Sequence, residues 1–343
     1  MPSTTEPMKP PPPSRTGPDR PPLVEWIERS IFSPAGRVDL IGAAACLGLM
    51  AWLFASNLRH FAYIWSTDEN YSHGFLVPLI SIYFVNEAMK GGPIERTRGV
   101  GLGLTLIVLS VLGRLATVLV PVGFVADGAL LLGIAGICSL LAGTTALRRF
   151  GFAIGFLVFM IPLPVALYAL IASPLQLMVS RVASRLLNTI GIPVLCQGNF
   201  LTLPGDIRLF VAEACSGMRQ LTGFLALTTA VAYGASRPVW QRTAIVVASV
   251  PIALTANIVR VSLTGWISYK IDPRYASGAF HTVEGLLMMG FGLSMLYGGC
   301  RLLDVISDVL EPRGPSKPSD PPPAAKTADA TLGDFRFEME PAG

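Results

Sequence analysis

The chemistry of this chain centres on the stretch Phe210–Leu227, which reads FVAEACSGMRQLTGFLAL and turns from polar to apolar. We expect Cys215 to lie at the N-terminus of a helix, where free N–H groups and the helix dipole favour the thiolate. Arg219 follows four residues later, so it shares a helical face with Cys215 and adds positive charge. The alternative is that Cys215 packs as a small, inert hydrophobe. The polar approach, the Ser-Gly pair that follows and Arg219 favour a nucleophile.

A second arginine lies inside an apolar run. Arg260 occurs in ANIVRVSLTG, residues Ala256–Gly265. A guanidinium costs at least about 2.5 kcal/mol inside a membrane span, so it usually faces a protein interior or a water-filled cavity. Snorkelling to the nearby end of the span is the alternative. With Asn257 one turn earlier, Arg260 is suited to stabilising an oxyanion or binding a carboxylate.

Histidine provides a candidate general base for the thiol. His281 occurs in AFHTVEG (Ala279–Gly285), at the head of another apolar run, and Glu284 lies three residues on, where it can orient the imidazole. The alternative is a histidine that is merely solvated. His73, in YSHGF, is the competing base because the expected topology places it at the same face of the membrane.

Composition places the chain among membrane proteins. Of its 343 residues, 52% are hydrophobic and only 14% are charged, whereas a soluble domain carries about 25% charged residues. We therefore expect an all-α, polytopic membrane protein with about eight transmembrane helices. Its lipid-facing surface makes membrane lipids a partner, and we expect no nucleic acid. No P-loop, GxGxxG or HExxH motif occurs, so we expect neither a cofactor nor a metal.

The apolar runs divide the chain into three parts. We expect a proline-rich tail at residues 1–37, a transmembrane domain at 38–303 and a disordered tail at 304–343. A short interfacial helix is predicted at Leu23–Phe32. The predicted spans are about Leu40–Asn57, His73–Met89, Val100–Val120, Val122–Ala142, Gly151–Ala172, Ala214–Tyr233, Thr243–Ile267 and Val283–Leu303.

The region between the fifth and sixth spans differs from the rest. Gln176–Leu187 is amphipathic and is expected at the membrane interface, and Thr189–Leu209 has the texture of turns and short extended segments. Two prolines in MIPLP (Met160–Pro164) predict a break in the fifth span.

The distribution of basic residues predicts how the spans are oriented. Most of the 26 lysines and arginines fall in the termini and in the connections on the same side. The positive-inside rule therefore predicts a multi-pass plasma-membrane protein with cytoplasmic termini. In that topology Cys215, Arg260 and His281 all reach the extracytoplasmic face.

Taken in order, these motifs resemble the exosortase/archaeosortase family of integral-membrane cysteine transpeptidases. The resemblance covers roughly Trp65 to Arg301, and the chain departs from a minimal family member in its long proline-rich ends. The motifs are WSTDENYSHGFLVPLIS (Trp65–Ser81), FLVFMIPLP (Phe156–Pro164), the run Gln176–Gly191, EACSGMRQL (Glu213–Leu221), NIVRV (Asn257–Val261) and FHTVEG (Phe280–Gly285).

The resemblance implies that Cys215 is the nucleophile, Arg260 an essential arginine and His281 the catalytic base. It implies that the substrates are exported proteins with a C-terminal sorting tail made of a short motif, a hydrophobic helix and a basic cluster. The enzyme would cleave at the motif outside the membrane through a thioester and transfer the protein to an acceptor.

Two other classes of function stay open from the residues alone. An anion or small-solute transporter would use Arg219 and Arg260 as ligands and would not need Cys215. A non-enzymatic scaffold of an envelope polysaccharide machine, itself a possible partner, would leave Arg260 unexplained.

Overall fold

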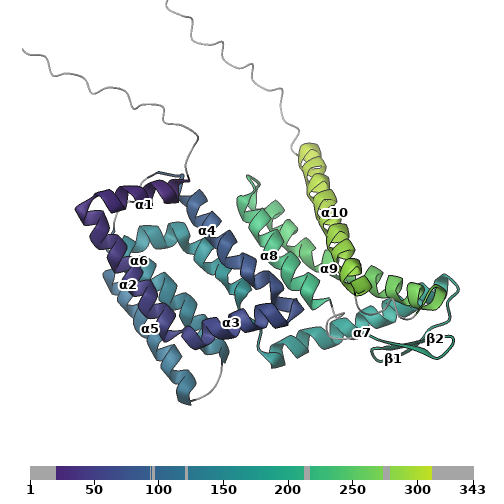
Figure 1. Ribbon diagram of the computed structural model, residues 1–343. Helices are drawn as coiled ribbons and strands as arrows, with labels where there is room; N and C mark the ends of the chain where they lie inside the picture. The colour runs from purple at the N-terminus through teal and green to yellow at the C-terminus, as the bar shows by residue number, and fades with distance from the viewer. Residues whose placement is uncertain are drawn as a thin grey trace, which may run out of the picture. The chain divides into compact units, whose positions relative to one another are not determined.

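The computed structural model describes residues 21–92, 94, 97–119, 123–211, 217–272 and 279–310. The chain divides into two compact units, one ending at Leu296 and the other beginning at Tyr297. Both boundary residues fall in the last helix, and every other element belongs to the first unit (Figure 1). The elements are α1 (Pro22–Phe32), α2 (Pro34–Leu53), α3 (Ala55–Thr67), η1 (Glu69–Phe75), α4 (Leu76–Met89), α5 (Val100–Leu119), α6 (Gly123–Phe156), η2 (Leu157–Met160), α7 (Val165–Thr189), β1 (Leu195–Gln197), β2 (Phe200–Leu203), β3 (Ile207–Phe210), α8 (Met218–Gly234), α9 (Val239–Lys270) and α10 (Ala279–Leu310).

The predicted class, an all-α polytopic membrane protein, is confirmed. By length and composition, six helices in the described part of the chain can cross a membrane. They include most of α2 and α10, the whole of α5, α7 and α9, and α6 together with η2. Helices α4 and α8 have 14 and 17 residues, fewer than the roughly 20 of a typical span. The expected number of about eight spans is therefore not reproduced by length alone.

The predicted fifth span, Gly151–Ala172, is wrong as a single helix. Helix α6 continues past Ala142 to Phe156, through a kink at Gly143 where φ is 88°. The chain then passes through η2, breaks at Ile161–Pro164 and restarts as α7 at Val165. The break follows from the two prolines of MIPLP, which lack the N–H that a continuous helix needs.

The region expected at the membrane interface, Gln176–Leu209, consists of the second half of α7 and the three strands. By length and composition α7 can itself cross a membrane, which differs from that expectation. The predicted amphipathic run is the second half of α7, which buries Val179, Ala183 and Leu187 and exposes Arg181 and Arg185. The strands make an antiparallel sheet in the order β1-β2-β3. Its inner face packs against α7 and α9 through an apolar cluster, so this region has its own core.

The helices before α7 pack around a separate aromatic core. Phe84 of α4 makes edge contacts with Phe152 and Phe156 of α6 and with Tyr233 of α8. The rings of Phe152 and Tyr233 stack 3.5 Å apart at an angle of 2°. These contacts connect α8 to the N-terminal helices.

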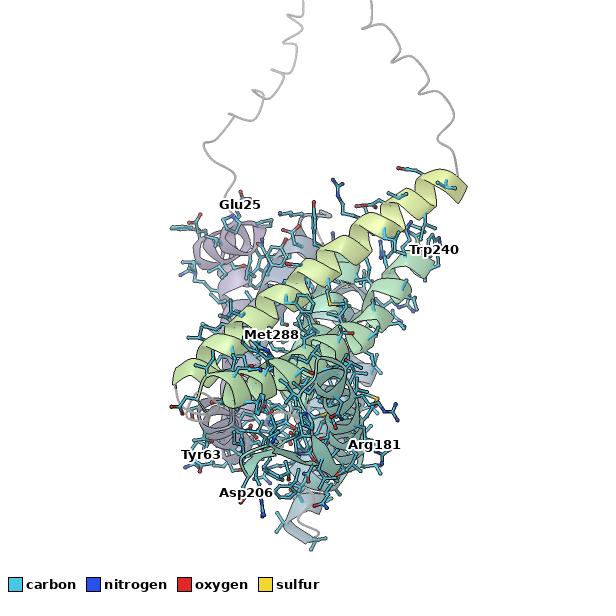
Figure 2. The ribbon with its side chains drawn as sticks, turned by 90° about the vertical axis from the view of Figure 1, so that its right-hand side faces the viewer. Glu25, Tyr63, Arg181, Asp206, Trp240 and Met288 are labelled. Carbon is cyan, nitrogen blue, oxygen red and sulfur yellow. The ribbon has the colours of Figure 1, made fainter. Side chains whose placement is uncertain are left out.

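Figure 2 shows the two ends of the first unit. Glu25 of α1 and Trp240 of α9 lie at one end, whereas Tyr63 of α3, Arg181 of α7 and Asp206 lie at the other. The connection between α8 and α9 therefore shares an end with α1, and the turn between β2 and β3 lies opposite, as the alternation of predicted spans requires.

Candidate functional site

Glycine at the start of α8 fixes the backbone beside the predicted nucleophile. Cys215 itself lies outside the described residues. Gly217 is the N-cap of α8 and has a left-handed conformation, with φ at 86°. A Cβ at Gly217 would lie 3.1 Å from Nδ2 of Asn257 on α9. The glycine of the Ser-Gly pair in the sequence is thus explained by this conformation and by the close approach of α9.

A buried ion pair joins α9 to α10. The side chains of Arg260 and Glu284 are both 1% exposed, and Arg260 Nε lies 4.0 Å from Glu284 Oε2. Thr264 connects the two, because its hydroxyl is 2.6 Å from Glu284 Oε1 and 3.0 Å from the Arg260 carbonyl oxygen. The burial of Arg260 excludes the snorkelling alternative in this structure. A buried pair of this kind is costly to break from one side, because the remaining charge is left without compensation.

Arg219 approaches the same place from α8. Its guanidinium forms an ion pair with Glu69 of η1 and lies within electrostatic reach of Asp68 and Arg260. A Cβ at Gly285 of α10 would lie 4.0 Å from both Arg219 Nη1 and Arg260 Nη2. Two guanidinium groups from different helices therefore converge on one glycine, and their like charges are offset by carboxylates on η1 and α10.

The motif that contains η1 is fixed to the break between η2 and α7. Trp65 donates from Nε1 to the Met160 carbonyl oxygen, and the Leu163 N–H donates to the Tyr71 hydroxyl. Gly74 allows the Trp65 ring to lie against η1, because a Cβ at this position would overlap Nε1 of Trp65. Two of the sequence motifs are thus packed together, and they hold Glu69 against α8.

The two histidine candidates have different settings. His73 of η1 is half-buried, and its imidazole interacts with the backbone of Phe159 and of Asn70 through hydrogen bonds. Burial lowers the pKa of His73, and these hydrogen bonds oppose the shift. His281 lies in the first turn of α10, three residues before Glu284, and its side chain is outside the described ones. The choice between the two bases is therefore untested.

Four of the predicted site residues meet in three dimensions. Arg219, Asn257, Arg260 and Glu284 come from three helices and surround the starts of α8 and α10. Sequence reasoning missed Thr264, which bonds to Glu284, and the acidic pair Asp68 and Glu69. The pair could have been noticed in STDEN, because charged residues are rare in this chain and two of them precede a predicted span directly.

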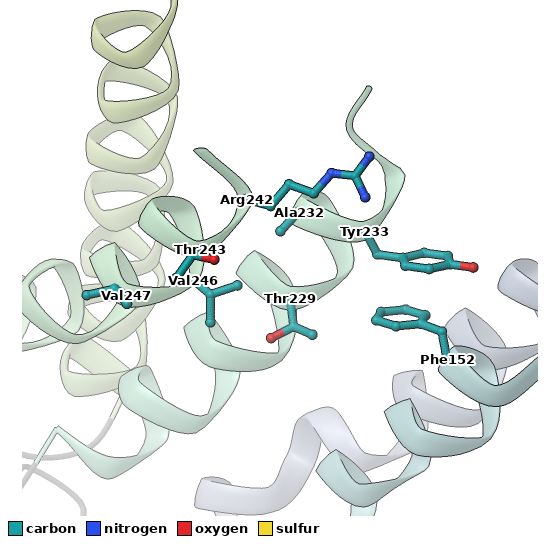
Figure 3. Close-up of a pocket in the computed structure, with 8 residues that line it drawn as sticks. All are labelled: Phe152, Thr229, Ala232, Tyr233, Arg242, Thr243, Val246 and Val247. Atoms are coloured by element: carbon teal, nitrogen blue, oxygen red, sulfur yellow. The ribbon is translucent and has the colours of Figure 1, made fainter. Parts of the chain in front are cut away.

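The pocket in Figure 3 lies apart from these residues. It has a volume of about 330 Å³ and is lined by Phe152 of α6 and by residues of α8 and α9 that include Tyr233 and Arg242. Its lining is mainly apolar and contains none of the predicted site residues.

Among the described residues, no group of three or more His, Cys, Asp or Glu side chains is placed to hold a metal ion. The cluster combines two guanidinium groups with the carboxylates of Glu69 and Glu284. The side chain of Arg260 is 1% exposed, and a guanidinium that is oriented and removed from water in this way can stabilise a negative charge that develops on a reacting oxygen.

A comparison with protein-family models finds one match, described as transmembrane exosortase, over residues 65–298. The match begins at Trp65, includes every predicted site residue and ends within α10. Neither the curated proteins nor the solved structures give a match.

Proposed function

The chain belongs to the transmembrane exosortase family, and from that membership we propose that it is a membrane-embedded cysteine transpeptidase. It cleaves C-terminal sorting tails of exported proteins at the extracytoplasmic face and transfers the proteins to an acceptor. The observation that carries this proposal is the burial of Arg260 with Glu284, beside Arg219 and at the start of the helix that bears His281.

Cys215 is the nucleophile in the proposed reaction. Its thiolate attacks the carbonyl carbon at the scissile bond, and a C–S bond forms as the carbonyl oxygen becomes negative. When the tetrahedral intermediate collapses, the C–N bond breaks and the tail amine takes a proton from the imidazolium of His281. The thioester that remains is attacked by an acceptor nucleophile, whose proton returns to the imidazole, and the thiolate is released.

The two arginines have separate roles in this scheme. Arg260 stabilises the oxyanion, because its guanidinium is buried and held by Glu284. Arg219 shares the helix that follows Cys215 and favours the thiolate by its positive charge. Glu284 orients Arg260, and Asn257 contacts the turn at Gly217. His73 is the alternative base.

The proposed substrate presents its cleavage motif at the depth of Cys215 while its hydrophobic helix lies in the membrane. The basic cluster that ends the tail stays on the cytoplasmic side, where the termini of this chain also lie. An envelope polysaccharide machine can supply the acceptor or work beside the enzyme.

The first experiment follows a tail-bearing exported protein from the same genome in cells that carry wild-type protein, Cys215→Ala or Cys215→Ser. Immunoblots for both proteins control abundance. Trimming by the wild type alone, at equal abundance of the variants, supports the proposal. Cys196→Ser is the matched control, because it removes a different thiol, in β1 of the sheet. Cells that carry this variant should trim the exported protein normally.

Normal trimming by both Cys215 variants would contradict the proposal. It would favour an anion or small-solute transporter that uses Arg219 and Arg260, or a scaffold, since neither needs the thiol.

A further inference from the structure

The sheet before Cys215 is a fixed platform with one side turned to the helices. Leu201, Leu203 and Val211 are 0%, 2% and 3% exposed, and they pack in one cluster with Val179 and Leu187 of α7. The outer face is different in character, because Phe200 and Phe210 are 48% and 53% exposed and their rings lie 4.9 Å apart. Among the described residues, the contacts that hold the sheet against the helices come from its inner face.

Strand β3 is an edge strand, and its register shows which backbone groups point outward. Leu209 pairs with Leu201, and the Val211 N–H donates to the Asn199 carbonyl oxygen. In an antiparallel ladder, alternate residues bond to the same neighbour. The backbone N–H and C=O groups of residues 207, 209 and 211 thus point toward β2. The same groups of Arg208 and Phe210 point away from it. Within the described part of the chain, no hydrogen bond occupies these outward groups.

This edge runs toward the candidate site. Strand β3 passes beside α9 at Gly265, where an added Cβ would be in ordinary van der Waals contact with Cδ1 of Leu209, at 3.8 Å. Gly265 is five residues from Arg260, or about 7.5 Å along the helix. At the end of the strand, Gln176 of α7 donates to the Val211 carbonyl oxygen at 3.2 Å. Only three residues lie between Val211 and Cys215 in sequence.

We propose that β3 binds the cleavage segment of the substrate as an additional β-strand. The extended segment pairs with the outward backbone groups of Arg208 and Phe210, in the strand that precedes Cys215 in sequence. Pairing with an exposed edge is a general way to bind an extended peptide, in which the backbone supplies affinity and alternate side chains supply specificity. The inference rests on the proposed function, because its partner is the substrate of that reaction.

The test uses the full-length enzyme in lipid nanodiscs and synthetic peptides that span the cleavage site of the trimmed protein. Single backbone N-methyl groups are placed at successive residues on the upstream side of the scissile bond. Pairing with an edge predicts a rise in KM at every second position, by about two- to ten-fold per lost hydrogen bond, with kcat little changed. Because only the peptide is modified and the enzyme is unaltered, a folding defect of the enzyme cannot cause the result.

Substitutions in β3 test the same contact from the enzyme. Phe210→Pro removes an outward N–H, whereas Phe210→Ala keeps it and removes only the ring. The ladder to β2 does not use this N–H, so the sheet should tolerate proline at an edge. We expect Phe210→Pro to raise KM several-fold more than Phe210→Ala. Equal changes would assign the effect to the exposed ring, in contact with lipid or substrate, and would overturn the inference.

The outcomes separate this inference from the proposed function. Cys215-dependent cleavage with no alternation along the N-methyl series overturns edge pairing and leaves the transpeptidase intact. Cleavage that does not depend on Cys215, or no cleavage at all, overturns the proposed function, and edge pairing falls with it.

Discussion

Two arginines in apolar surroundings show how the halves of the molecule differ. Arg114 of α5 donates to the Leu53 carbonyl oxygen and to the hydroxyls of Ser56 and Thr117. All three acceptors are neutral, so Arg114 links α5 to the end of α2 and the start of α3 by hydrogen bonds alone. Arg260 instead faces a carboxylate at 4.0 Å, with Arg219 close enough to interact electrostatically.

The comparison teaches that buried charge has different consequences in the two regions. Around Arg114 and the neighbouring Asn57–Asp127 hydrogen bond of 2.7 Å, polar groups satisfy one another locally. Around Arg260, like charges from α8 and α9 are brought together, which costs free energy unless carboxylates or a developing oxyanion offset it. Such concentrated, oriented charge is typical of functional sites.

The largest expected effect would come from Arg260→Gln. We expect activity to fall about 10²- to 10³-fold, because an oxyanion partner is lost. The protein should also lose about 3–5 kcal/mol of stability, since Glu284 stays buried without its partner. The double variant Arg260→Gln/Glu284→Gln should recover most of the thermal stability but not the activity. If the double variant recovered activity, Arg260 would have only a structural role. Arg114→Gln is the control, and its turnover should stay near that of wild type.

Gly217→Ala tests the turn before α8. Alanine in the left-handed region costs about 1–2 kcal/mol, and its Cβ would press on Asn257. We expect a lower melting temperature and a loss of processing. Gly223→Ala, in the same helix with no heavy atom within 4 Å of the added carbon, should stabilise the helix by up to about 1 kcal/mol. Equal behaviour of the two variants would show that the turn at Gly217 is not special.

Glu69→Gln tests the contact between η1 and α8. The Glu69 side chain is 70% exposed, so we expect only about a two- to five-fold fall in kcat/KM, the size of an exposed ion pair. Raising the salt concentration should reduce the difference from wild type. Glu87→Gln in α4 removes the surface pair with Lys90, the residue that follows this helix, and should leave kcat/KM unchanged. An unaltered Glu69→Gln enzyme would mean that Arg219 is positioned by α8 and α9 alone.

The smallest expected effect concerns His73 and pH. Burial lowers the pKa of His73 below its ordinary value of 6.5. The unfolded chain therefore binds this proton first as the pH falls, and stability declines from about pH 6.5 downward. His73→Gln should show a shallower decline in melting temperature over that range. A decline identical to that of wild type would show that other groups cause the acid sensitivity.

Several features of the fold could be predicted because they depend on neighbouring residues only. An amphipathic pattern predicted α1, apolar runs predicted α5 and α9, and the prolines of MIPLP predicted the break before α7. The continuation of α6 past Gly143 was missed, because glycine can act as a kink or as an end, and the contact with Thr97 that decides this is remote in sequence.

The sequence could predict which residues belong to the candidate site, but it could not predict the contacts between them. Arg219, Asn257, Arg260 and Glu284 could be identified because charged and amide side chains are costly in apolar spans. Glu69 could have been noticed as a charge next to a span, but its partner could not, since Arg219 lies 150 residues away in sequence.

By itself, the sequence determined the membrane class, the positions of most helices and the choice of Cys215, Arg260 and His281 as candidates, because hydropathy and residue chemistry are local properties. Only the tertiary structure decided that Arg260 pairs with Glu284, that Arg219 reaches Glu69 and Gly285, and that β3 is an edge strand of the sheet in the described part of the chain. These contacts depend on how helices far apart in the chain pack, and the free energy of packing is a property of the whole assembly of side chains.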